Sequence, residues 1–171
     1  SMWESHRRVV IATDAGIDLR TGLAEHYRIL IVPRLFRAGD EVHLSATGPR
    51  QFAMNESLSE ILPARSEDFI NAYSQVERAH IIMIHLSKIF DNAADEARKA
   101  QILLGNRQEI QVFEAKTTEA GVRFLVETVS HFVQQAKSPS PGQVLSFLKQ
   151  VGQELGTYVF VEDPAGAPIA K

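Results

Sequence analysis

The stretch Val9-Val10-Ile11-Ala12-Thr13-Asp14-Ala15-Gly16-Ile17-Asp18-Leu19 decides the fold. Its first residues are apolar or small without interruption, a pattern typical of a β-strand that is buried on both faces. Asp14 then stands at the carboxyl end of that strand, which is the edge where open α/β sheets bind their ligands. Asp14 is therefore a candidate for contact with a polar ligand group, or alternatively the side-chain acceptor that closes the turn after the strand.

Further strands alternate with helices along the chain. Short β-rich runs that end at a turn or a proline predict strands at 28–33, 80–86, 110–113 and 157–161, and a hairpin around Gly39-Asp40. Composition, apolar spacing and capping residues predict helices at 17–27, 49–60, 66–79, 87–104, 121–136 and 141–151. Alternating strands and helices imply right-handed crossovers, so we predict an α/β fold with a mostly parallel sheet covered by helices on both faces.

Serine residues mark several of the predicted helix starts. Ser66 precedes two acidic residues and an apolar run, which favours an N-cap. Ser140 precedes Pro141, and proline is well suited to the first position of a helix. Ser87 is expected to cap the helix that follows it.

Bulk properties limit the classes of function. The formal net charge of −3 gives no general attraction to nucleic acids or anionic membranes. No apolar run approaches the about 18 residues that cross a bilayer. The chain has no cysteine, which excludes disulfides, thiolate zinc sites and cysteine nucleophiles. We therefore expect a cytoplasmic protein with no nucleic-acid partner and no membrane span.

Residues 1–171 are expected to form one domain. Residues 1–8 form an N-terminal segment in which Ser1, ahead of Met2, is interpreted as a cloning scar, and residues 162–171 form a loose tail. No secretory signal is recognised at the start.

No metal and no cofactor is predicted. His80 and His85 lie on the same strand but point to opposite faces, and the other histidines lack the spacing of metal ligands. The glycine-rich signatures of nucleotide binding and the Gly-x-Ser-x-Gly elbow of hydrolases are absent.

The opening stretch resembles the first motif of the DegV family, two-domain bacterial proteins that bind fatty acids. In that family the first strand usually ends Thr-Asp-Ser and continues to Asp-Leu. This chain keeps Thr13, Asp14, Asp18 and Leu19, and has Ala15 in place of the serine. The resemblance extends over nearly the whole chain in element order and corresponds to the family's first domain. It implies a DegV-like α/β domain that holds a fatty acid in an apolar slot and presents it to a kinase partner.

Head-group positions of the family carry different residues in this chain. The family's Ser-Gly-Thr turn after the third strand is matched by Phe90-Asp91-Asn92, and its Asp-Ser pair after the fourth strand by Glu114-Ala115. A hydroxyl pair ahead of the helix near Phe69 is matched by Ile61 and Leu62. Asp91 at such a position would repel an anion. The head group would then use another counter-ion, be uncharged, or be absent.

The candidate ligand-binding residues are Asp14, Arg65, Ser66, Ser87 and Asn92. Arg65 or Lys88 could be the counter-ion of a charged head group. Each candidate also has an ordinary structural interpretation. Arg65 can be a solvated loop cation, Ser66 and Ser87 can be helix caps, and Asn92 can simply belong to the first turn of a helix.

We expect a binding protein for a fatty acid or another single-chain amphiphile, without catalysis of its own. Because the sequence corresponds to one of the family's two domains, a protein partner or a second copy of the chain is expected to cover the open face. Two alternatives remain. One is a structural or regulatory interaction module that has lost lipid binding, and the other is a small-molecule enzyme that uses the strand-end carboxylates Asp14 and Glu114.

Overall fold

The computed structural model describes residues 8–20, 22–47, 59–155 and 158–161. The N-terminal segment 1–7, the tail 162–171 and most of the helix expected at 49–60 lie outside the described residues.

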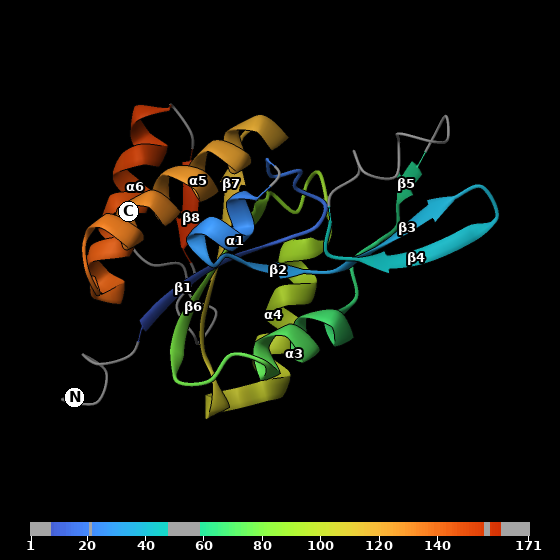
Figure 1. Ribbon diagram of the computed structural model, residues 1–171, viewed down its shortest axis with the longest axis horizontal. Helices are drawn as coiled ribbons and strands as arrows, with labels where there is room; N and C mark the ends of the chain where they lie inside the picture. Colours follow the sequence, from blue (N-terminus) through green and yellow to red (C-terminus); the bar gives the residue numbers. More distant parts are fainter. Residues whose placement is uncertain (1–7, 21, 48–58, 156–157, 162–171) are drawn as a thin grey trace.

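A five-stranded sheet in the order β2-β1-β6-β7-β8 forms the centre of the molecule (Figure 1). Its strands are β1 (Arg8–Asp14), β2 (Leu30–Val32), β6 (Ala79–Leu86), β7 (Glu109–Lys116) and β8 (Tyr158–Val161). The first four strands run parallel, and β8 joins β7 antiparallel at the edge. The prediction of a mostly parallel α/β sheet is confirmed.

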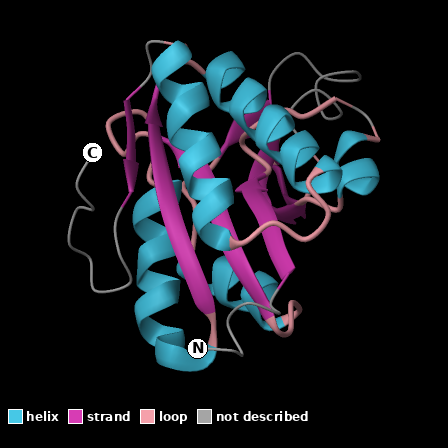
Figure 2. Cartoon of the chain, turned by 90° about the vertical axis from the view of Figure 1, so that its left-hand side faces the viewer, coloured by secondary structure: helices cyan, strands magenta, loops and turns pink. Residues whose placement is uncertain are grey.

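Helices cover both faces of this sheet (Figure 2). The helices are α1 (Leu23–Tyr27), α3 (Ser66–Ser74), α4 (Ala93–Leu104), α5 (Glu119–Gln135) and α6 (Pro141–Glu154). One buried cluster joins α3 and α4 to Val10 and Ala12 of β1. The other joins α5 and α6 to Val9 and Ile11. Because successive side chains of β1 enter opposite clusters, the strand is apolar at consecutive positions from Val9 to Ala12 rather than at every second one.

A small second sheet, in the order β4-β3-β5, extends away from the main sheet (Figure 1). Its strands are β3 (Arg34–Ala38), β4 (Glu41–Ser45) and β5 (Ser59–Ile61). The hairpin predicted around Gly39-Asp40 is confirmed, and Gly39 has the positive φ of 62° that favours glycine. The helix expected to reach residue 60 is wrong at its end, because residues 59–61 pair with β3 instead.

Helix α3 starts and ends differently from the prediction. Arg65 is its N-cap residue and Ser66 is its first helical residue, so Ser66 is not the cap. The helix ends at Ser74 rather than near Ala79, because Gln108 donates from Nε2 to the carbonyl oxygens of Tyr73 and Val76, at 3.0 Å each. These bonds satisfy carbonyl groups at the helix end, and the chain can then turn into β6.

Helix α4 begins later than expected. Residues 87–92 form a turn in which the N–H groups of Phe90 and Asp91 bond to the carbonyl oxygen of Ser87. Ser87 therefore does not cap α4, whose N-cap residue is Asn92. The first helix is also shorter than the expected 17–27, because Gly22, with φ 81°, directly precedes its start at Leu23.

The start of α6 follows the prediction closely. Ser140 accepts a hydrogen bond from the N–H of Gln143, and the Gln143 side chain accepts one from the N–H of Ser140. This reciprocal pair is a capping box, with Pro141 at the first helical position.

Candidate functional site

The candidate site lies where the chain path through the sheet changes direction. From β1 the chain moves to one side to form β2 and later returns to the other side to form β6. Crossovers leave β1 in opposite directions at this point, which opens a crevice at the carboxyl ends of the two central strands. Asp14 ends β1 and Leu86 ends β6, so both residues border that crevice.

Asp14 is almost fully enclosed, with 2% of its surface exposed. Its Oδ1 accepts hydrogen bonds from the Gly16 N–H and from Arg34 Nη1, both at 2.8 Å. Its Oδ2 lies 2.7 Å from His85 Nδ1. Asp14 therefore closes the turn after β1 and also holds two side chains from other parts of the chain.

These contacts keep Asp14 ionised. Burial by itself would raise the pKa of Asp14, but the hydrogen bond and charge of His85 and the charge of Arg34 act in the opposite direction and leave the pKa at about 2. Because a carboxylate can only accept hydrogen bonds, Nδ1 of His85 carries the proton that it shares with Asp14.

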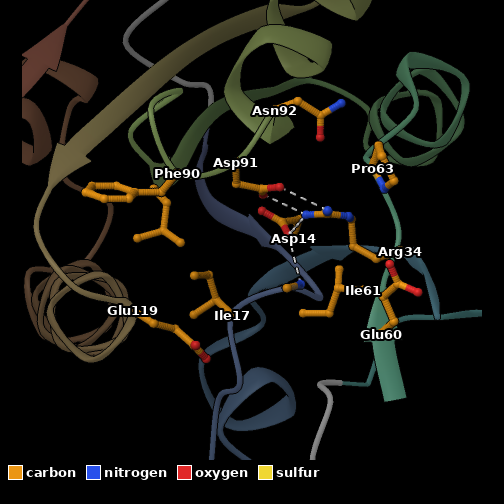
Figure 3. A pocket seen from close by; sticks show the side chains of 12 residues that line it. Asp14, Ile17, Arg34, Glu60, Ile61, Pro63, Phe90, Asp91, Asn92 and Glu119 are labelled. Carbon is orange, nitrogen blue, oxygen red and sulfur yellow. Dashed lines mark hydrogen bonds and ion pairs between the residues drawn. The ribbon is translucent and has the colours of Figure 1, made fainter. Parts of the chain in front are cut away.

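Arg34 is the centre of the site (Figure 3). Its Nη1 donates to Asp14 Oδ1 and to Asp91 Oδ2, each at 2.8 Å. Its Nη2 donates to the Leu62 carbonyl oxygen at 2.8 Å and to Asp91 Oδ1 at 3.1 Å. Burial would lower the pKa of Arg34, but the hydrogen bonds and charges of Asp91 and Asp14 outweigh it and raise the pKa. The guanidinium therefore carries a permanent positive charge between two carboxylates.

His85 and His80 lie on opposite faces of the sheet, as predicted. His85 packs its ring edge-on against Phe69, with 5.6 Å between ring centroids, and its Nε2 has no hydrogen-bond partner among the described residues. His80 instead contacts Glu109 at 3.1 Å and Gln111 at 2.8 Å. Within the described residues, no group of three or more His, Asp or Glu side chains is placed to hold a metal ion.

A pocket of about 740 Å³ opens beside this cluster. Its volume falls within the range of about 300–1,000 Å³ that is usual for small-molecule sites. Its described apolar wall residues are Ile17, Ile61, Pro63, Leu86 and Phe90, and its polar ones are Asp14, Arg34, Glu60, Asp91, Asn92 and Glu119. Figure 3 shows Asp14 and Asp91 both directed at Arg34, with Ile17, Ile61 and Phe90 around the pocket.

A second hollow of about 540 Å³ adjoins the pocket. Leu86, Phe90 and Glu119 line both spaces, and Ile89 and Lys116 belong to the second one. Ile89 is 72% exposed and Phe90 is 68% exposed. An apolar surface therefore continues from the pocket along the turn before α4.

Two of the residues predicted to bind a ligand, Asp14 and Asn92, lie on the pocket wall. Asn92 uses its amide to hold the loop before α3: its Oδ1 accepts from the Ala64 N–H at 2.8 Å and its Nδ2 donates to the Ala64 carbonyl oxygen at 3.1 Å. The side chain thus connects the turn before α4 to the loop that carries Pro63.

The other residues predicted to bind a ligand are Arg65, Ser66 and Ser87, and none of them lines the pocket or the adjoining hollow. Arg65 pairs with Asp68, with two N–O distances of 2.9 Å. The Ser66 N–H donates to Glu96 Oε2 at 3.0 Å. Ser87 is 3% exposed, and its Oγ accepts from the Ile89 N–H at 3.4 Å. These contacts stabilise loops and helix starts close to the site.

Glu114 does not share the pocket with Asp14. Its Oε1 accepts from the Lys88 N–H and its Oε2 from Arg98 Nη2, both at 2.6 Å. Glu114 is 7% exposed, and the two strand-end carboxylates are held in separate ion-pair networks. This separation gives no support to an enzyme that uses them as a pair.

Sequence reasoning did not find Arg34, and it assigned Asp91 only a repulsive effect. A signal for Arg34 was present: it follows Val32-Pro33, at the carboxyl end of a strand predicted to lie in the same parallel sheet as the strand of Asp14. Carboxyl ends of parallel strands meet at the same edge, so an arginine there could have been expected near Asp14.

The match to known families decides the relationship. The family model described as "Uncharacterised protein, DegV family" matches residues 8–164 of this chain. The chain belongs to the DegV family. The resemblance noted from the sequence is thereby confirmed. A search of curated proteins found no match.

Solved structures of DegV proteins share the fold. A fatty-acid-binding DegV family protein from Thermus thermophilus aligns with a TM-score of 0.68 and 16% identity, covering 96% of this chain and 70% of that one. A stearic-acid-binding protein from Eubacterium ventriosum gives a TM-score of 0.65 and 18% identity, covering 81% and 51%. The fatty acid kinase B3 protein of Streptococcus pneumoniae, loaded with linoleic acid, gives a TM-score of 0.56 and 14% identity, covering 96% of this chain and 72% of that one.

In the described part of the chain, none of the helices has the length and apolarity needed to cross a membrane.

Proposed function

We propose that this DegV protein binds a fatty acid or a similar single-chain lipid and has no catalytic activity of its own. The observation that carries the proposal is the pocket of about 740 Å³ at the carboxyl edge of the sheet, with an apolar surface that continues into the adjoining hollow. Leu86 and Phe90 line both spaces, which gives an extended hydrocarbon chain a continuous path. Burying such a chain supplies favourable free energy in proportion to its apolar area.

The ligands named for the structural neighbours support the same class. The T. thermophilus protein is described as binding fatty acid, the E. ventriosum protein as binding stearic acid, and the S. pneumoniae protein as loaded with linoleic acid. Each of these ligands is a single-chain lipid, and each is bound by a protein with the fold of this chain.

Presentation of the lipid to a protein partner, or to a second copy of this chain, is part of the proposal. Ile89 and Phe90 are largely exposed apolar residues at the mouth of the pocket. Exposed apolar surface next to a binding site is typical of a contact surface. A partner seated there would also shield the hydrocarbon chain from water. The cytoplasmic location inferred from the sequence stays a prediction.

Three lipids that share one chain and differ in the head group test the proposal: dodecanoic acid, dodecanol and dodecylamine. Calorimetric titration at concentrations below micelle formation is expected to show saturable binding of at least one of them. Ile61→Trp should weaken that binding about tenfold or more, because the larger ring fills the pocket. Ile102→Trp is the matched control, since Ile102 is 77% exposed on α4 and lines neither space.

The interaction-module alternative predicts a different result. If none of the three lipids binds, the single-chain lipid proposal fails, and the exposed surface at Ile89 and Phe90 becomes a protein contact only. Equal weakening by Ile61→Trp and Ile102→Trp would also contradict the proposal, because the effect would then not come from the pocket.

A further inference from the structure

The polar wall of the pocket accepts hydrogen bonds far more readily than it donates them. Its described acidic residues are Asp14, Glu60, Asp91 and Glu119, and Arg34 is the only described wall residue with a positive charge. A lipid head group that enters the pocket therefore meets more negative than positive charge.

Arg34 has little left to offer an anionic head group. A guanidinium carries four hydrogens on its terminal nitrogens, and all four are used by Asp14, Asp91 and the Leu62 carbonyl oxygen. Its Nε is buried, without a partner among the described residues, and a ligand could reach it only if the surrounding atoms moved. Arg34 therefore has no terminal N–H group free to bind an anionic head group.

An incoming carboxylate could take the place of Asp91 on Arg34, but the exchange gains nothing. One carboxylate–guanidinium pair would be lost for each one formed, and the displaced Asp91 would remain as a negative charge beside the ligand. Asp14 cannot move away in the same manner, because it is also held by Gly16 and His85.

Acceptor groups, in contrast, are accessible. The Asp91 side chain is 26% exposed, and each of its oxygens receives one hydrogen bond from Arg34. A carboxylate oxygen can accept a second bond. Glu60 and Glu119 are exposed residues on the same wall. A head group with an N–H or O–H donor can therefore bind without disturbing the Arg34 cluster.

We propose that the lipid bound in this pocket has a head group that donates hydrogen bonds and carries no negative charge, as in a long-chain alcohol, amide or amine. The inference rests on the proposed function, since it concerns the head group of the lipid that the pocket is proposed to bind. It narrows that function: among single-chain lipids, one with a donor head group and no negative charge is expected to bind more tightly than an ionised fatty acid.

The same series of dodecyl compounds tests this inference separately. For the wild-type protein near pH 8, dodecylamine and dodecanol are expected to bind at least about tenfold more tightly than dodecanoate, because like charges repel across the pocket. Dodecanoate binding as tightly as dodecanol would overturn the inference, although the single-chain lipid proposal would survive. Failure of all three to bind would reject the lipid proposal itself.

A variant that removes the charge of Asp91 tests whether this residue causes the head-group preference. Asp91→Asn keeps the size of the side chain and is expected to narrow the preference for dodecanol over dodecanoate by about tenfold. Asp95→Asn is the matched control, because Asp95 is an exposed acid on α4 that lines neither space. Glu119→Gln serves as the second test at an exposed position, where folding is not at risk, and should narrow the preference in the same direction.

Lys116, which lines the adjoining hollow, is the alternative position at which a carboxylate head group could bind. If a carboxylate head group binds at that end, Lys116→Met will weaken dodecanoate binding and leave dodecanol binding unchanged, while Asp91→Asn will change neither. That pattern would overturn the inference. The inference predicts the reverse: the preference for dodecanol over dodecanoate depends on Asp91 and Glu119, and Lys116→Met leaves dodecanoate binding unchanged.

Discussion

Arg34 and Asp91 form a two-pronged ion pair although they are 57 residues apart in the sequence, with N–O distances of 2.8 and 3.1 Å. The pair connects the start of β3, where the small sheet leaves the main one, to the turn before α4. Because the same guanidinium also bonds to Asp14 at the end of β1, one side chain holds three segments of the pocket wall together. The shape of the pocket therefore depends on Arg34.

Replacing Arg34 is expected to destabilise the protein strongly. Arg34→Met removes the buried cation that Asp14 and Asp91 share, and loss of one partner from a buried pair costs about 3–5 kcal/mol. Arg37→Met on the same strand should change the free energy of unfolding by at most about 1 kcal/mol, because Arg37 is 51% exposed and pairs with Glu60 at the surface. Urea denaturation of both variants measures the difference. Similar values for the two variants would show that the Arg34 cluster contributes little to stability.

Gly16 is expected to tolerate no side chain. A Cβ at this position would lie 2.7 Å from Asp14 Oδ1 and 3.0 Å from Arg34 Nη1. Gly16→Ala should therefore displace Asp14 and lower the melting temperature. Gly142→Ala is the control: the nearest atom to its Cβ is Ser140 Oγ at 3.9 Å, and alanine favours the helix, so stability should be unchanged or raised. A Gly16→Ala protein as stable as the wild type would contradict the geometry described at Asp14.

Asp14 makes the stability of the protein sensitive to acid. Its pKa of about 2 lies below its ordinary value of 3.8. A lowered pKa contributes stability that is present above the ordinary value and is lost as the pH falls through the folded-state value. The loss between about pH 4 and pH 2 should be on the order of 2 kcal/mol. NMR titration of the Asp14 carboxyl carbon tests the cause directly, and a midpoint at or above 3.8 would contradict the account.

Removing the buried hydroxyl of Tyr73 is expected not to destabilise the protein. Its ring is fully buried beside Phe69, and its hydroxyl has no hydrogen-bond partner among the described residues. Burial raises the pKa of Tyr73. Removing a buried hydroxyl that lacks a partner should leave stability unchanged or raise it by up to about 2 kcal/mol in Tyr73→Phe. Tyr27→Phe is the control, because the Tyr27 hydroxyl bonds to His131 at 3.1 Å and its loss should cost about 1 kcal/mol.

The elements that the sequence predicted correctly are those whose structure is decided by residues next to one another in the chain. The unbroken apolar run before Asp14 indicated a strand buried on both faces, and Ser140-Pro141 indicated a helix start with its cap. In both places the residues that decide the structure are neighbours in the sequence. The strand-end position of Asp14 also followed from the run itself.

Tertiary contacts decided the rest. The spacing of Ile89, Ala93 and Ala97 favoured a helix from Ser87, but residues 87–92 form a turn in which Asp91 bonds to Arg34 and Asn92 bonds to Ala64. Ser66 looked like a cap, yet its N–H bonds to Glu96 of another helix. No local pattern reports such partners, so the bonds from Arg34 to Asp91 and to the Leu62 carbonyl oxygen became visible only in the structure.

Native mass spectrometry of the purified protein, followed by extraction and identification of any bound lipid, tests the central claim most directly. The account predicts a complex with one single-chain lipid per protein chain, reduced in Ile61→Trp and retained in Ile102→Trp. A protein that carries no lipid and that binds none of the three dodecyl compounds would contradict the account.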